Sequence, residues 1–181
     1  YGLPHQTTAS FAATVDKVLG LRPDRLAVYN FAFLPERNPH QRAIDAETLP
    51  AADEKFKIFL EAYDRFIDAG YRYIGMDHFA LPEDELAHAY DEGTMQRNFM
   101  GFTTRAGADM LAFGVSSIGF IDGMFVQNTK KLTRYETALA DGEFPIERGL
   151  LLTADDHLRR DVIGGLMCAD HIDKRAIERR H

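Results

Sequence analysis

The segment 50–76 constrains the fold more than any other part of the chain. Apolar residues recur in it at spacings of three and four, which predicts an amphipathic helix that begins after Pro50 and ends at Gly70. Residues 71–76 are then predicted to form a strand. The apolar side chains of this helix are expected in the core rather than around a cofactor; they are Phe56, Phe59, Leu60, Tyr63, Phe66 and Ile67.

The preceding segment shows the same alternation of helix and strand. Thr7 or Thr8 can cap a helix that ends at Gly20. Residues 26–33 are almost wholly apolar, which is typical of a strand buried on both faces of a parallel sheet. The order helix, strand, helix, strand predicts an α/β fold with parallel strands and helical crossovers. In such folds the functional residues lie beyond the carboxyl ends of the strands.

In the remainder of the chain, separate helices and one buried strand at 109–118 are predicted. Helices are expected at 82–93 and 129–140, from Thr153 to about Cys168, and from Lys174 onward; Thr153 and Asp156 resemble a capping box. We expect residues 1–150 to form an α/β domain and 151–181 to begin a helical one. The chain starts without Met and stops inside a helical pattern, so we expect a segment of a longer protein.

Composition narrows the class of protein. The 181 residues are 45% hydrophobic and 27% charged, as in soluble globular proteins, and no apolar run is long enough to span a membrane. The net charge of −7 gives no general attraction to nucleic acid. Cys168 is the one cysteine and excludes an internal disulfide, so a cytoplasmic location is expected.

Three polar residues are candidates for a binding site. Asn30 interrupts the apolar run, and a binding role and a purely structural role are both open. His78 follows the predicted strand 71–76, where site residues gather. Arg97 offers a planar fork for a carboxylate, and its alternative is an ion pair with Asp91 or Glu92.

The common catalytic motifs are absent from the sequence. It contains no HExxH, no GxSxG, no Walker loop and no GxGxxG. Cys168 lies in an apolar helical pattern and is expected to be a buried thiol rather than a nucleophile. The residues alone therefore predict an α/β enzyme segment with a polar or anionic ligand.

Several motifs, in order and without large gaps, run through essentially the whole chain. They are Tyr1-Gly2-Leu3-Pro4-His5-Gln6-Thr7, Pro23-Asp24-Arg25-Leu26, Met76-Asp77-His78-Phe79-Ala80, Asp84-Glu85-Leu86, Arg97-Asn98-Phe99, Gly101-Phe102-Thr103-Thr104 and Gly114-Val115-Ser116. Together they resemble oxygen-independent coproporphyrinogen III oxidase, a radical SAM family of haem biosynthesis.

The resemblance implies a fold and a reaction. The fold is the C-terminal part of a partial (β/α) radical SAM barrel, followed by the start of a mostly helical C-terminal domain. The reaction converts two propionates of coproporphyrinogen III to vinyl groups and gives protoporphyrinogen IX. The implied cofactors are S-adenosyl-L-methionine (SAM) and a 4Fe-4S cluster, and an electron donor for the cluster is the implied protein partner.

The resemblance also assigns residues to the cofactors. Ala32 and Ile118 match SAM contacts of the family, although core packing is an alternative for both. The family's cluster motif, CxxxCxxC, is absent here, so this chain contributes no metal ligand and the cluster ligands are expected upstream. The isolated chain is accordingly expected to be inactive, and the full-length protein is expected to be a monomer without nucleic-acid or membrane partners.

Two other functions remain open at this stage. A haem-binding chaperone of the same fold family is the first alternative. The second is a metal-dependent hydrolase that would use Asp77 and His78.

Overall fold

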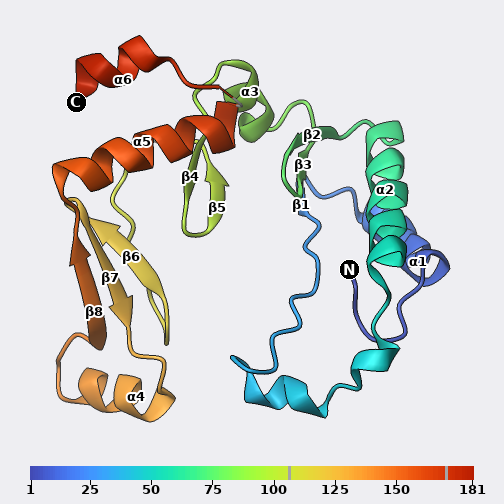
Figure 1. The fold of residues 1–181 in the computed structure, drawn as a ribbon, viewed down its shortest axis with the longest axis horizontal. Coiled ribbons are helices and arrows are strands. Elements are labelled where there is room, and N and C mark those ends of the chain that lie inside the picture. The colour runs from blue at the N-terminus through green and yellow to red at the C-terminus, as the bar shows by residue number, and fades with distance from the viewer. Residues whose placement is uncertain (106, 170) are drawn as a thin grey trace. The chain divides into compact units, whose positions relative to one another are not determined.

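The computed structural model describes residues 1–105, 107–169 and 171–181. The chain divides into two compact units, Tyr1–Asp91 and Glu92–His181 (Figure 1). The mixed α/β class predicted from the sequence is confirmed. The predicted boundary near residue 150 lies inside the second unit, and the assignment of domains there stays a prediction.

The first unit combines helices with one small sheet. The sheet has the order β1-β3-β2, and both strand pairs are antiparallel. Its elements are α1 (Thr8–Leu21), β1 (Arg25–Ala27), the 3-10 turns η1 (Pro39–Ala43) and η2 (Ala46–Thr48), α2 (Ala52–Asp68), β2 (Arg72–Gly75), β3 (His78–Ala80) and α3 (Glu85–Asp91).

The predicted helices of this unit form where local signals place them. Thr7 caps α1 in a capping box with Ser10, and α2 follows Pro50 by two residues. The buried face of α2 carries Ile58, Ala62 and Phe66, which follow the 3–4 spacing of the sequence. Both helices therefore form where predicted. The predicted core face of α2 is only partly right: Phe66 is buried and Phe59 and Tyr63 are half-buried, but Phe56, Leu60 and Ile67 are exposed because the face that packs on the sheet is centred on Ile58, Ala62 and Phe66.

Phe79 on β3 lies at the centre of the core of this unit. Its side chain is 0% exposed. The rings of Phe66 and Tyr73 each lie 5.3 Å from its ring, and that of Tyr63 lies 5.9 Å away. Val15 of α1 belongs to the same cluster, so this core joins both helices to the sheet.

The prediction of parallel strands is wrong for this unit. β2 and β3 are joined by a tight reversal in which Gly75 and Met76 have φ of 136° and 54°. Such positive φ values let the chain turn back at once, so no helical crossover is needed. The reversal places Asp77 in the turn and His78 at the first position of β3.

The predicted strand at 26–33 is also mostly wrong, because regular pairing ends at Ala27. Beyond it, the Val28 N–H donates to the Asp77 carbonyl at 2.8 Å and the Phe31 N–H donates to the Tyr1 carbonyl at 2.7 Å. These backbone groups find unrelated partners instead of one neighbouring strand. The apolar run is therefore an irregular segment held by separate contacts.

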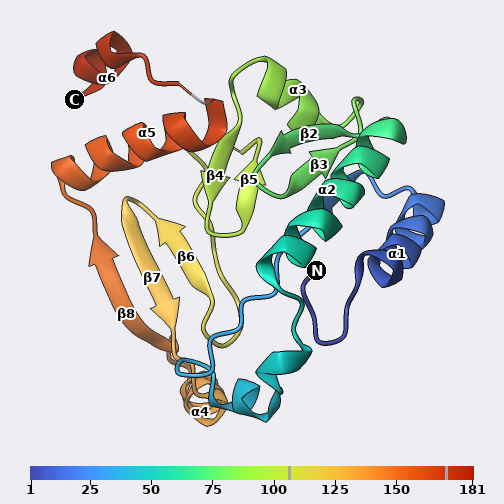
Figure 2. The same cartoon turned by 45° about the vertical axis from the view of Figure 1, so that its right-hand side comes forward.

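The second unit contains a hairpin, an antiparallel sheet and three helices. In Figure 2, α4 lies at one end of the sheet and α5 at the other. The sheet has the order β6-β7-β8. The elements are β4 (Gln96–Asn98), β5 (Gly101–Thr103), β6 (Ile118–Ile121), β7 (Met124–Asn128), α4 (Leu132–Ala140), β8 (Ile146–Leu151), α5 (Ala154–Ala169) and α6 (Lys174–Arg180).

The strand predicted at 109–118 is wrong, because this segment is a loop that leads into β6. Apart from Ile118, which begins β6, only Met110 of this segment forms a bridge, to Phe120. The Gly114 N–H donates to the Tyr135 hydroxyl at 3.0 Å, and the Asn128 amide donates to the Gly114 carbonyl at 3.0 Å. Polar side chains thus satisfy the backbone groups that a strand would have used.

The helical end of the chain follows its prediction. The Thr153 hydroxyl accepts from the Asp156 N–H, and the Asp156 carboxylate accepts from the Thr153 N–H at 2.9 Å, which completes the predicted capping box of α5. Asp161 on α5 accepts from Arg180 on α6 at 2.9 Å. No helix of the described residues is long and apolar enough to cross a membrane.

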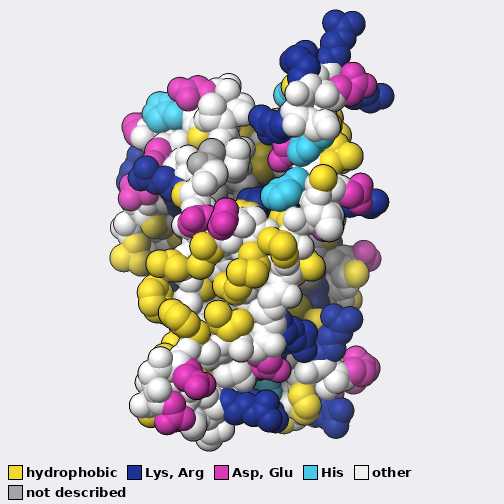
Figure 3. All heavy atoms as spheres, turned by 90° about the vertical axis from the view of Figure 1, so that its left-hand side faces the viewer, with side chains coloured by type: hydrophobic (Ala, Val, Ile, Leu, Met, Phe, Trp, Pro, Cys, Tyr) yellow, Lys and Arg dark blue, Asp and Glu magenta, His cyan; other side chains and the backbone are white. Residues whose placement is uncertain are grey.

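The edge strand β8 exposes apolar side chains. Every residue of β8 is exposed, including Leu150 and Leu151. Figure 3, which views the side of the molecule that carries β8, shows apolar side chains gathered on this face. An apolar edge strand of this kind can pair with a further strand.

Candidate functional site

His78 lies between an acidic and an aromatic neighbour in the first unit. Its Nδ1 atom lies 2.7 Å from the Asp77 carboxylate, and its Nε2 atom lies 3.5 Å from the Tyr29 hydroxyl. The Tyr29 and His78 rings meet edge to face, with 5.8 Å between centroids. Asp77 lies within ion-pair distance of Nδ1, but the geometry is not that of a hydrogen bond, and the Tyr29 ring packs against the imidazole. The arrangement suits an oriented histidine whose Nε2 can form a hydrogen bond with a ligand.

Asn30 and Ala32 follow Tyr29 in the irregular segment after β1, and both are exposed. The Asn30 side-chain oxygen lies over Gly2, where an added Cβ would come within 2.7 Å of it. The Ala32 carbonyl accepts from the Gln41 side chain at 3.1 Å, which fixes the backbone there and leaves the methyl group exposed. Ala32 does not pack into the core of this unit, and its role as a cofactor contact stays a prediction.

Arg97 lies on β4 of the second unit, opposite Phe102 in the hairpin register. Its predicted structural alternative is wrong, because Asp91 pairs with Arg72 instead, at 2.6 Å, and no ion pair joins Arg97 to Glu92 among the described residues. Ile118 begins β6, is half-buried and lies opposite Gln127.

The second unit contains a cavity of about 440 Å³, which we call the arginine cavity. Its volume is typical of small-molecule sites. The hairpin β4–β5, the sheet and α5 all contribute to its wall. The residues that line it are Gln96, Arg97, Asn98, Phe99, Thr103, Arg105, Gly107, Ala108, Met110, Phe120, Phe125, Leu152, Asp156, Arg159, Arg160, Ile163, Gly164 and Met167.

The charged side chains that line this cavity are mostly positive, and the arginines differ in what they contact. Four arginines line it beside one carboxylate, Asp156. Hydrogen bonds from Thr153 lower the pKa of Asp156, so this carboxylate stays ionised near neutral pH. Arg159 pairs with Asp155 at 2.6 Å, whereas the guanidinium of Arg160 lies over the Phe120 ring, 4.1 Å from its centroid.

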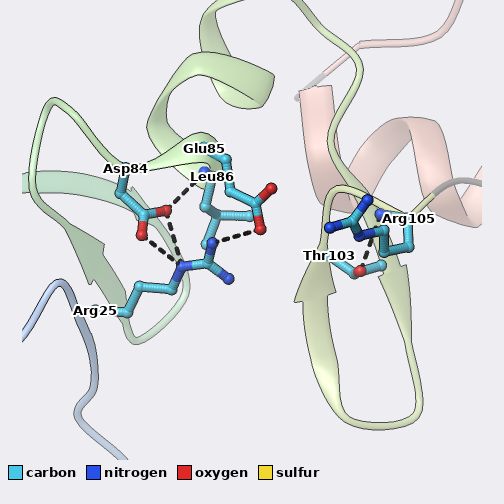
Figure 4. Close-up of polar contacts among 6 residues, drawn as sticks. All are labelled: Arg25, Asp84, Glu85, Leu86, Thr103 and Arg105. Carbon is cyan, nitrogen blue, oxygen red and sulfur yellow. Dashed lines mark hydrogen bonds and ion pairs between the residues drawn. The ribbon is translucent and has the colours of Figure 1, made fainter.

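Arg105 enters the cavity from the end of β5. Its backbone N–H donates to the Thr103 hydroxyl at 3.1 Å, as Figure 4 shows. No ion pair to its guanidinium is present among the residues that the structure describes. Sequence reasoning predicted Arg97 as a candidate and missed Arg105, Arg159 and Arg160. The adjacent arginines at 159–160, within a helix that also carries apolar residues, were the available signal.

The candidate residues are divided between the two units. Asn30, Ala32 and His78 belong to the first, and Arg97 and Ile118 belong to the second. Within the first unit, the structure places Tyr29, next to Asn30, against His78. Within the second, Arg97 lines the arginine cavity and Ile118 does not.

The residues of this chain cannot hold an iron–sulfur cluster by themselves. Such clusters are held by several thiolates, and the sequence has one cysteine. Cys168 is buried, and burial raises the pKa of its thiol. No group of three or more His, Cys, Asp or Glu side chains that could hold a metal is present in the described part of the chain.

Comparison with known proteins gives one consistent family. No protein-family model matches the chain. It is 50% identical over 168 residues to the oxygen-independent coproporphyrinogen III oxidase of Pseudomonas aeruginosa, which covers 93% of this chain and 36% of that protein. It is 48% identical over 181 residues to the protein of the same name from Thermostichus vulcanus, covering 99% and 56%.

A solved structure agrees with these relatives. Coproporphyrinogen III oxidase (HemN) from Escherichia coli, described as a radical SAM enzyme, matches with a TM-score of 0.92 and 44% identity, over 99% of this chain and 42% of that one. The chain thus spans between about a third and somewhat over half of the length of these proteins.

Proposed function

Since the chain belongs to the oxygen-independent coproporphyrinogen III oxidases over the part of these proteins that it spans, we propose that the protein performs their reaction. This reaction is the conversion of two propionates of coproporphyrinogen III to vinyl groups, giving protoporphyrinogen IX. The observation that carries the proposal is the likeness itself, 44% identity with a TM-score of 0.92 over nearly the whole chain.

The cofactors of the proposed reaction are SAM and a 4Fe-4S cluster, which together supply an organic radical. The single cysteine here does not fit the cluster, so its ligands are proposed to lie in the part of the relatives that this chain does not span. Ala32 and Ile118 are the proposed SAM contacts of this chain. An exposed methyl group and a half-buried aliphatic side chain are suited to pack against an adenine ring.

The residues of this chain are proposed to act mainly on the substrate. Arg97 has no ion-pair partner among the described residues and can accept a propionate bidentately. His78, oriented by Asp77 and Tyr29, is the proposed partner of another polar group of the porphyrinogen. Asn30 is proposed to contribute an amide in the adjoining segment.

The alternatives receive less support. The relatives compared above are named as oxidases, which gives no support to a haem-binding chaperone. Asp77 and His78 face each other, and the described residues contain no third ligand grouped with them. The geometry therefore gives no support to a hydrolase.

The test uses a protein that carries this chain together with the remaining segments of its relatives. Under strictly anaerobic conditions with SAM and a reductant, we expect loss of two carboxyl groups from coproporphyrinogen III, measured by chromatography of the oxidised products. Cleavage of SAM without decarboxylation, or tight binding of haem in place of coproporphyrinogen III, would contradict the proposal.

A further inference from the structure

The arginine cavity has a charge opposite to that of the chain as a whole. The net charge of the chain is −7, yet the cavity is lined by four arginines and one carboxylate. A concave surface with low-dielectric walls focuses the field of its charges on the ligand inside. A cavity of this kind attracts anions although the protein as a whole repels them.

Neighbouring arginines on α5 differ in what they contact. Arg159 forms an i,i+4 ion pair with Asp155, as exposed helical arginines commonly do. Arg160 has no carboxylate within ion-pair distance among residues 1–105, 107–169 and 171–181. Instead its guanidinium rests on the Phe120 ring, which orients the fork and leaves its N–H groups available.

Arg97 faces the same space from a different element. α5 packs against β4, on which Arg97 lies. Arg97 and Arg160 both line the arginine cavity, and both also line a second cavity of about 230 Å³ beside it. Asp161, which also lines the second cavity, pairs with Arg180 and His181, so neither Arg97 nor Arg160 is neutralised by a carboxylate among the described residues and both can donate to an anion.

Much of the remaining wall of the cavity is apolar and aromatic, beside the polar Gln96, Asn98 and Thr103. Phe99, Phe120 and Phe125 line it, and the rings of Phe120 and Phe125 lie 4.8 Å apart. A ligand that fits must therefore combine carboxylates with a flat or ring-shaped apolar body. A simple inorganic anion would leave the aromatic wall unused.

We infer that Arg97 and Arg160 together hold one ionised propionate of the tetrapyrrole, with a pyrrole ring against Phe120 and Phe125. The identity of the ligand rests on the proposed function, whereas the pairing of the arginines rests on the cavity. Arg160 is thereby a substrate-binding residue that no sequence motif of the chain indicated.

The test measures binding of coproporphyrin III, the stable oxidised form of the substrate, to this 181-residue chain by fluorescence titration. Arg97→Gln and Arg160→Gln should each raise the dissociation constant roughly tenfold or more, because each removes charge-assisted hydrogen bonds. The double variant should bind little worse than either single variant, since one carboxylate is lost in each case. Arg148→Gln, on the exposed strand β8, is the matched control and should leave binding unchanged.

A second part of the test compares coproporphyrin III with its tetramethyl ester. Coproporphyrin III tetramethyl ester has the same ring and no carboxylates, so it should bind roughly tenfold more weakly or worse. Equal binding of acid and ester would overturn the inference, as would unchanged binding by both single variants or no binding of coproporphyrin III to the chain. None of these results depends on radical chemistry, so the proposed function is judged separately by the decarboxylation assay.

A folding control keeps the variants interpretable. The thermal midpoint of Arg97→Gln should equal that of the wild type, because Arg97 forms no ion pair within the described residues. That of Arg160→Gln should fall only slightly, because it loses the contact of the guanidinium with Phe120 and no ion pair. If either variant unfolds, Arg97→Lys and Arg160→Lys retain the charge but lose the fork. These should still weaken coproporphyrin III binding, and unchanged binding by both would overturn the inference.

Discussion

Replacement of Phe79 by alanine should strongly destabilise the first unit. The side chain is 0% exposed, and three aromatic rings lie within 5.9 Å of its own. Truncation of a buried Phe to Ala lowers the free energy of unfolding by about 3–5 kcal/mol. Because aromatic pairs are lost as well, we expect about 4 kcal/mol at this site. With a urea slope of about 2 kcal/mol/M, the unfolding midpoint should fall by about 2 M.

The assay is urea unfolding of the chain, followed by circular dichroism and tyrosine fluorescence. Phe56→Ala is the matched control, because Phe56 lies on α2 of the same unit and is 62% exposed. Its free energy of unfolding should change by about 0.5 kcal/mol or less. If Phe79→Ala shifted the midpoint no more than this control, the core described around β3 would be wrong.

Three further predictions concern function, pH and metal. In the full-length protein, Arg97→Lys keeps the charge but loses the bidentate fork. KM for coproporphyrinogen III should therefore rise about tenfold, while uncoupled SAM cleavage should change much less. A lower thermal midpoint with unchanged KM would indicate a structural role instead. Burial raises the pKa of Asp161, but hydrogen bonds from Arg180 and His181 outweigh burial and lower it. The contact between α5 and α6 is therefore stabilised at pH values above the unfolded pKa of about 3.9 and weakens as the pH falls through the folded pKa. Hydrogen-exchange protection of α6 should fall in acid for this reason. Equal protection in the wild type and in Asp161→Asn at pH 6 would contradict this. The isolated chain should bind no cluster after anaerobic reconstitution, and stoichiometric iron and sulfide would refute that expectation.

Local signals made the helices predictable. The capping residues Thr7 and Thr153 form the hydrogen bonds that their sequence positions indicate. The 3–4 spacing along α2 predicted the helix correctly, although Phe66 is the one side chain of the predicted set that is fully buried. Such features depend on residues within one turn of each other, so the sequence contains all the information that they need.

Strand pairing was not predictable in the same way. The apolar run 26–33 suggested a doubly buried parallel strand, but β1 pairs with β3, about fifty residues away, in antiparallel register. The reversal at Gly75 and Met76 makes β2 and β3 antiparallel, and a methionine with positive φ gives no signal in the sequence. Apolar content indicates burial, whereas the direction of pairing depends on distant segments.

The candidate site was predicted residue by residue and not as a cavity. Arg97 was chosen for its chemistry and does line the arginine cavity. Arg160 lies 63 positions away on α5, and its contact with Phe120 depends on the packing of a helix against a sheet. Sequence spacing contains no trace of that contact, which is why this arginine was missed.

The motifs that resemble a family contain both structural and functional residues. The contacts in the structure show which residues belong to each kind. Arg25 and Asp84 belong to two of the motifs that carried the resemblance, yet Figure 4 shows them joined to each other. The Arg25 Nε–H donates to Asp84 at 2.8 Å, and Asp84 also accepts from the Leu86 N–H at 2.7 Å at the start of α3. These motif residues satisfy one another and need no ligand. Arg97 and Arg160 have no such partner among the described residues. A carboxylate of the bound substrate can supply one.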